Sequence, residues 1–116
     1  MKGYAPVALL LAVCCAQDAL AQQDGGPLNG TQMRGRQLLA QSCGVCHLPT
    51  VMGGKTYGPP LHKGSTAGSD ELMRAFILNG SARMPGFKHY FQPADVDAII
   101  AYVRTVSAPA AATENR

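Results

Sequence analysis

Apolar residues recur at helical spacing in three stretches of this chain. The pattern is clearest near the C-terminal end, where Val96, Ile99, Ile100 and Val103 form one apolar stripe. Pro93 precedes this stripe and is a favoured first residue of a helix. The pattern therefore predicts a helix that opens at Pro93 and buries one face.

A second helix is expected between a start signal at Ser69 and a stop signal at Asn79 and Gly80. Asp70 and Glu71 would lie in its first turn, where acidic side chains are favourable. Four apolar side chains in this stretch follow helical spacing, and we expect all of them in the core: Leu72, Met73, Phe76 and Ile77.

The first helix should begin near Thr31 and run into residues 43–47. Gly35 lies inside it and costs about 1 kcal/mol relative to alanine. It is either a tolerated surface glycine or a point of close approach, for which Tyr102 of the last helix is a candidate. Residues 50–68 are rich in glycine and proline and should form an irregular loop.

Length and charge narrow the class of protein. A chain of 116 residues predicts one small domain. Lys and Arg number 10 against 7 Asp and Glu, with no dense basic run, which argues against a nucleic-acid partner.

The first residues resemble an export signal. Lys2 precedes an apolar run over residues 5–16, and Ala19-Leu20-Ala21 fits the small-residue cleavage rule. We expect cleavage after Ala21 and a periplasmic protein. The run is shorter than the roughly 20 residues that a membrane-spanning helix needs, so we expect a mature form that does not span a membrane.

Two alternatives remain for this segment, an uncleaved anchor and a lipoprotein acylated on Cys14 or Cys15. Val13, which precedes Cys14, is not the small residue that acylation favours.

The sequence Cys43-Gly44-Val45-Cys46-His47 has the spacing of a c-type haem attachment motif. Residues three and four apart share one face of a helix. Each cysteine can therefore add to one vinyl group of a porphyrin, and the histidine can offer a nitrogen to its iron. The alternatives are a thioredoxin-like redox pair and half of a zinc site. The first lacks flanking strands and the second lacks further cysteines after Cys46.

From this motif outward, the chain resembles the class I c-type cytochromes over residues 30–106. Gly35, Leu39 and Cys43 match the family's opening G-x-x-x-aromatic-x-x-x-C-x-x-C-H, although Leu39 replaces the aromatic residue. Further matches are Gly58-Pro59-Pro60-Leu61, Asn79-Gly80 followed by Met84-Pro85, and Ala101-Tyr102-Val103-Arg104.

The resemblance implies an all-α, cytochrome c-like fold with three to four short helices and long loops around one covalently attached haem c. Cys43 and Cys46 would form the thioethers, His47 would bind the haem iron on the proximal side, and Met84 on the distal side. Met84 follows a helix stop and precedes Pro85-Gly86, so an extended loop can bring it across the haem.

The resemblance gives other residues smaller roles at the haem, and two histidines compete with Met84 as the distal ligand. The carbonyl of Pro59 would accept a hydrogen bond from His47, and Tyr57 and Lys55 would contact a haem propionate. His62 and His89 are rivals of Met84 that would give ligation by two histidines. His89, which is close to Met84 in sequence, is the stronger rival.

These observations predict four segments: a cleaved signal peptide (1–21), a flexible leader (22–29), a cytochrome c domain (30–107) and a disordered tail (108–116). The domain is expected to be a monomer.

The predicted function is electron transfer rather than catalysis at the iron. The expected partners are a donor dehydrogenase, such as a quinoprotein alcohol or sugar dehydrogenase, and a downstream cytochrome or terminal oxidase. The alternatives are a haem-based sensor or weak peroxidase with a labile sixth ligand, and an electron-relay subunit of a membrane oxidoreductase complex.

Overall fold

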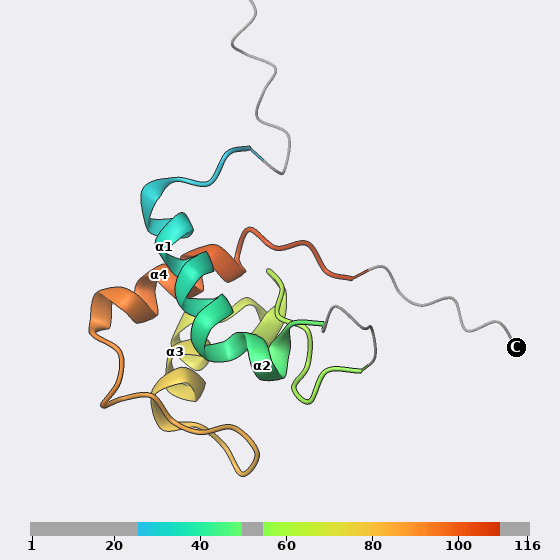
Figure 1. Ribbon diagram of the computed structural model, residues 1–116, viewed down its shortest axis with the longest axis vertical. Coiled ribbons are helices and arrows are strands. Elements are labelled where there is room, and N and C mark those ends of the chain that lie inside the picture. The colour runs from blue at the N-terminus through green and yellow to red at the C-terminus, as the bar shows by residue number, and fades with distance from the viewer. Residues whose placement is uncertain (1–25, 50–54, 110–116) are drawn as a thin grey trace, which may run out of the picture.

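The computed structural model describes residues 26–49 and 55–109 (Figure 1). The predicted signal peptide, Cys14 and Cys15 lie outside the described residues, as does most of the predicted tail. The helical elements are α1 (Gly30–Leu38), a π-helical turn (Leu39–Cys43), α2 (Gly44–His47), a 3₁₀ turn (Ser65–Gly68), α3 (Asp70–Asn79) and α4 (Pro93–Val103). No strand occurs in these two ranges, which confirms the all-α class.

Helix α1 begins at Gly30, one residue before the predicted start, because Asn29 caps it. The Asn29 side chain accepts from the Gln32 N–H at 2.9 Å, and the Gln32 side chain accepts from the Asn29 N–H at 3.0 Å. This reciprocal pair satisfies two backbone donors that the first turn leaves free.

A π-helical turn joins α1 to α2 and ends at Cys43, the first residue of the Cys-x-x-Cys-His motif. Such turns widen the helix locally and frequently mark functional sites. Here the turn buries Leu39 and Cys43, which are 3% and 8% exposed. The sequence pattern did not reveal this change of helix type.

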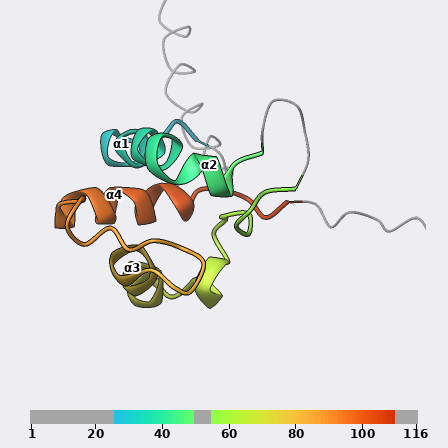
Figure 2. The same ribbon diagram turned by 60° about the horizontal axis from the view of Figure 1, so that its bottom comes forward.

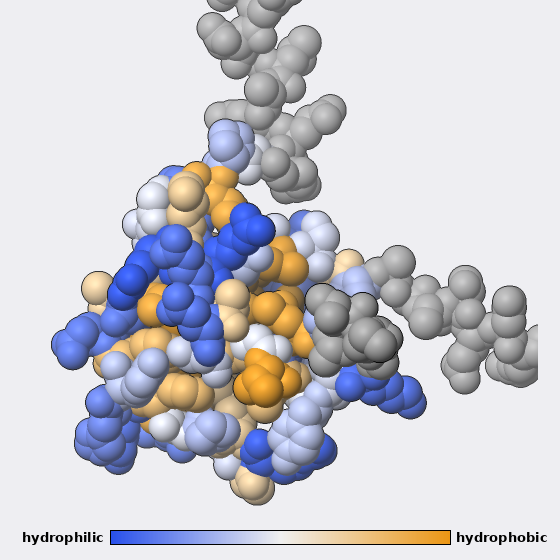
Figure 3. Space-filling model, viewed as in Figure 1, coloured by the Kyte–Doolittle hydropathy of each residue, from blue (hydrophilic) through white to orange (hydrophobic). Residues whose placement is uncertain are grey.

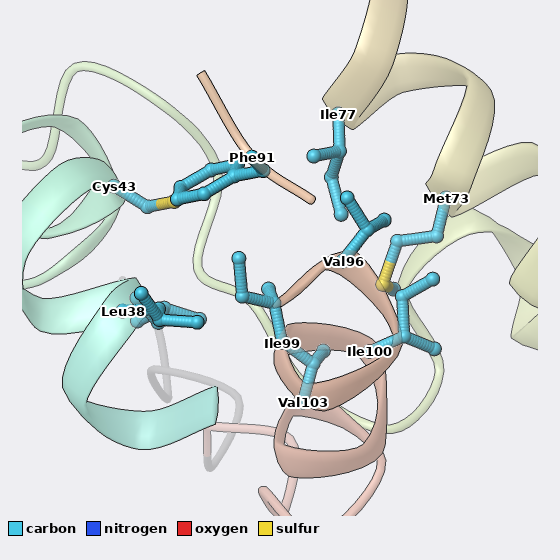
Figure 4. Packing of buried hydrophobic residues seen from close by; sticks show 10 residues of the cluster. Leu38, Cys43, Met73, Ile77, Phe91, Val96, Ile99, Ile100 and Val103 are labelled. Atoms are coloured by element: carbon cyan, nitrogen blue, oxygen red, sulfur yellow. The ribbon is translucent and has the colours of Figure 1, made fainter. Parts of the chain in front are cut away.

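Helix α4 lies between α1 and α3 (Figure 2). Its four predicted stripe residues are all buried, as expected. Side chains of α1 and α3 converge on this stripe, together with Phe91 from the preceding loop (Figure 4). The core therefore forms around α4.

The core prediction was half wrong for α3. Met73 and Ile77 are buried, but Leu72 is 46% and Phe76 is 41% exposed. Helix α3 packs on α4 with one face only, so the helical spacing overestimated the width of the buried stripe. Phe76 borders the cavity described below.

Gly35 is a point of close approach, and the atoms nearest to it belong to the backbone of α4. A Cβ at this position would overlap the backbone carbonyl of Ala98 in α4. The glycine therefore lets the backbones of α1 and α4 touch. Tyr102 instead packs, half-buried, at the edge of the core.

Two side chains within α4 form ion pairs with its neighbours, in addition to the pair that Arg104 forms at its C-terminal end. Arg34 of α1 lies 3.1 Å from Asp95, and Arg74 of α3 contacts Asp97. Both pairs are partly exposed, so each contributes little beyond orientation. Among the described helices, none combines the length and apolar character needed to cross a membrane.

The contact between Gly35 and Ala98 predicts a strong effect of one methyl group. Gly35→Ala should destabilise the haem-containing protein by about 2 kcal/mol, because the two helices must separate. Gly30→Ala is the matched control, since a Cβ there meets nothing within 4 Å. Its effect should stay within about 0.5 kcal/mol. Equal midpoints of chemical unfolding for the two variants would contradict this packing.

Candidate functional site

A cavity of about 540 Å³ opens between α2, α3, α4 and two loops. Its wall is mostly apolar. Six of the seven predicted site residues line it: Cys43, Cys46, His47, Tyr57, Pro59 and Met84. Lys55 is exposed and lies outside the lining, and its contact with a haem propionate stays a prediction.

The His47 imidazole is oriented by the loop that follows it. Its Nδ1 lies 2.8 Å from the backbone carbonyl of Pro59. Because a carbonyl only accepts, Nδ1 must carry the proton and donate. In the neutral ring Nε2 then keeps its lone pair, which is the state a metal ligand needs.

Gly58 is a site residue to which the sequence analysis gave no role. Its N–H donates to the Cys46 carbonyl at 2.8 Å. A Cβ at Gly58 would lie 2.6 Å from Cε1 of His47, so the absence of a side chain lets the loop backbone lie directly on the imidazole. The Gly58-Pro59 pair in the sequence was the feature that could have indicated this close approach.

His62 also lines the cavity, but its hydrogen bonding is opposite to that of His47. Its Nδ1 accepts from the Gly64 N–H at 3.1 Å. In the neutral ring the proton must then be on Nε2, which leaves that nitrogen without a lone pair for a metal. His89 is exposed and does not line the cavity. The geometry therefore favours Met84 over both rivals.

The Met84 loop is a tight turn fixed to the end of α3. Gly80 has a φ of 72°, in the left-handed region that favours glycine. The Ser81 N–H donates to the Met84 carbonyl at 2.8 Å, and the Phe87 N–H donates to the Ile77 carbonyl at 2.9 Å. These bonds place the half-buried Met84 side chain on the cavity wall.

Tyr57 and Arg83 connect the two loops at the cavity. The Arg83 guanidinium carbon lies 4.8 Å from the centre of the Tyr57 ring, within the range of a cation–π interaction. Both residues line the cavity, and Arg83 directly precedes Met84. The pair thus links the loop next to His47 with the loop that carries Met84.

Cys43 and Cys46 both lie on the cavity wall, and no disulfide joins them. Burial raises the pKa of Cys43 above its ordinary value, and the neighbouring Cys46 raises it further. Before haem attachment, the Cys43 side chain therefore favours the uncharged thiol, as an apolar wall requires.

These donors fit a haem of the c type. Two thiols three residues apart, an imidazole with a free Nε2 and a thioether all face one apolar cavity. Cys43 and Cys46 are the residues that would hold the porphyrin covalently, and His47 and Met84 those that would bind its iron. Met73 also borders the cavity, but its side chain lies beside Val96 and Ile100 in the core (Figure 4).

The helical fold and the Cys-Gly-Val-Cys-His motif, which comprises Cys43 and all of α2, define a class I c-type cytochrome. A family model described as cytochrome c oxidase, cbb3-type, subunit III matches residues 30–103, and the chain belongs to this family of c-type cytochrome domains. No curated protein and no solved structure matches the chain. The protein binds haem c covalently, and the haem iron supplies one-electron redox chemistry.

The position of Gly58 predicts a specific spectroscopic effect. Gly58→Ala should displace the His47 ring, weaken its bond to iron and raise the high-spin fraction of the ferric protein, as measured by electron paramagnetic resonance. Gly64→Ala is the matched control, because its Cβ would lie 3.1 Å from the ring of His62 instead. A high-spin fraction that is the same in both variants would contradict the role of Gly58.

Proposed function

We propose that this protein is a periplasmic monohaem electron carrier. It takes single electrons from a donor dehydrogenase, such as a quinoprotein alcohol or sugar dehydrogenase, and delivers them to a downstream cytochrome or terminal oxidase. The family supports electron transfer. The choice of partners rests on the loop sequences around Gly58 and Met84, which resemble those of small cytochromes that serve such enzymes.

One observation carries the proposal: His47 and Met84 line the same cavity, with His47 in the state that can bind a metal. Two axial protein ligands leave no position on the iron for a substrate. The protein then acts by moving electrons rather than by chemistry at the iron. A methionine ligand also raises the reduction potential relative to a second histidine.

The surface around α2 supports an electron exit on that side of the molecule. Val45 lines the cavity and is 88% exposed, so the cavity wall reaches the surface there. Hydrophobic surface gathers over α2, with hydrophilic side chains around it (Figure 3). The two loops that border the cavity carry four exposed basic residues: Lys55, Lys63, Arg83 and Lys88. Such charges would steer an acidic partner surface.

A second candidate function is an electron-relay subunit inside a membrane oxidoreductase complex. The description of the matching family, which names an oxidase subunit, favours it. Cell fractionation distinguishes these two candidate functions. A carrier is released with the periplasmic contents, whereas a relay subunit stays with the washed membranes together with its complex.

Replacing Met84 tests whether two protein ligands occupy both axial positions of the iron. Met84→Ala should abolish the weak far-red absorption band that a thioether ligand gives to ferric haem, and should lower the reduction potential. The control His89→Ala should leave both unchanged, because His89 is exposed and outside the cavity lining. Absence of the band in the unmodified protein, with rapid carbon monoxide binding to its ferrous form, would favour the sensor or peroxidase alternative.

The steering charges predict salt-dependent kinetics. Oxidation of the ferrous protein by the anionic complex hexacyanoferrate(III) should slow several-fold as ionic strength rises. Lys55→Gln and Lys88→Gln should flatten this dependence, whereas Arg36→Gln on α1 should not. A dependence that is flat, or that all three variants change equally, would show that these charges only contribute to solubility.

A further inference from the structure

A half-buried arginine at the end of α4 makes the densest set of side-chain hydrogen bonds near the cavity. Arg104 donates from Nη1 to the carbonyls of Lys63 and Ser65, at 2.8 and 2.9 Å. Its Nε donates to Asp70 at 2.7 Å, and its Nη2 lies 3.5 Å from the Thr66 hydroxyl. One guanidinium therefore joins the end of α4, the start of α3 and the chain between them.

The turn that Arg104 contacts has an unfavourable backbone. Thr66 and Ala67 have φ values of 56° and 52°, and Gly68 follows with 78°. Left-handed backbone is disfavoured for residues that carry a Cβ. Two such residues in succession persist only when the surrounding structure holds them. The two hydrogen bonds from Arg104 to the carbonyls of Lys63 and Ser65, which we call the fork, hold the chain beside this turn.

The same turn ends a segment that forms one wall of the cavity. Seven lining residues come from this stretch: Gly58, Pro59, Pro60, Leu61, His62, Ser65 and Thr66. At its first end, the segment is fixed by the bonds from Gly58 to Cys46 and from His47 to Pro59. At its other end, Arg104 holds it, together with one backbone bond from the Lys63 N–H to the Val106 carbonyl.

We propose that Arg104 is a positioning residue for the proximal haem ligand. By bridging two carbonyls, it fixes the far end of the 58–66 segment and so keeps the Pro59 carbonyl on Nδ1 of His47. Loss of the bridge lets the segment move away from the cavity, and the Nδ1 proton becomes accessible to water. The inference rests on the part of the proposed function in which His47 binds the iron.

Hydrogen exchange of the His47 Nδ1 proton tests this in the reduced haem-containing protein, by nuclear magnetic resonance. In Arg104→Gln, we expect this proton to exchange at least tenfold faster, relative to the core amide protons of Leu38 and Ile99. Arg104→Met keeps a long side-chain stem but has no donor for either carbonyl. It should show the same change, and it serves as the test if the glutamine variant does not mature.

Asp70→Asn is the matched control, because it removes the ion pair and leaves the fork on Lys63 and Ser65 intact. Its Nδ1 exchange should match that of the unmodified protein. The proposal is overturned if the core amides accelerate as much as Nδ1 in the Arg104 variants, since Arg104 would then only stabilise the fold. It is also overturned if Asp70→Asn reproduces the change. A high-spin or bis-histidine spectrum in the unmodified protein would refute the assignment of Met84 but not this proposal, which requires only that His47 binds the iron.

Discussion

The core of this domain and the wall of its cavity are built from the same side chains. Ile77, Ile99 and Val103 belong to the buried cluster and also line the cavity. A domain of this size buries a modest share of its surface and is marginally stable. A haem attached through two thioethers would add a large apolar surface beside these side chains. We therefore expect the fold to depend on the cofactor as much as the cofactor depends on the fold.

The helices and the loops have separate tasks in this arrangement. The direct contact of α1 and α4 at Gly35 and Ala98 gives a rigid base for the Cys-x-x-Cys-His motif. The two ligand loops are fixed by backbone hydrogen bonds to α2 and to the end of α3. Ligands that are held before an electron arrives move little when it does, and this rigidity suits a carrier.

The sequence was most informative where a local signal acts alone. Pro93 and Ser69 marked the starts of α4 and α3 correctly, because caps and first-turn residues act within one turn. The spacing of Cys43, Cys46 and His47 likewise indicated the haem motif directly. The resemblance to cytochromes supplied Pro59 and Met84, and the structure places both on the cavity wall.

Features that depend on packing could not be predicted in this way. The exposure of Leu72 and Phe76 follows from the single face that α3 turns to α4. The left-handed pair Thr66 and Ala67 follows from contacts with Arg104, which lies far away in sequence. Helical spacing contains no information on either, since both depend on which distant segment lies opposite.

The measurement that tests this account most directly is thermal unfolding, followed by far-ultraviolet circular dichroism, with and without haem. Residues 22–116 made without the attachment machinery would be compared with the matured haem protein. We predict a sharp cooperative transition for the haem protein and no cooperative transition for the apoprotein. An apoprotein that unfolds cooperatively at the same temperature would contradict the claim that the haem completes the core.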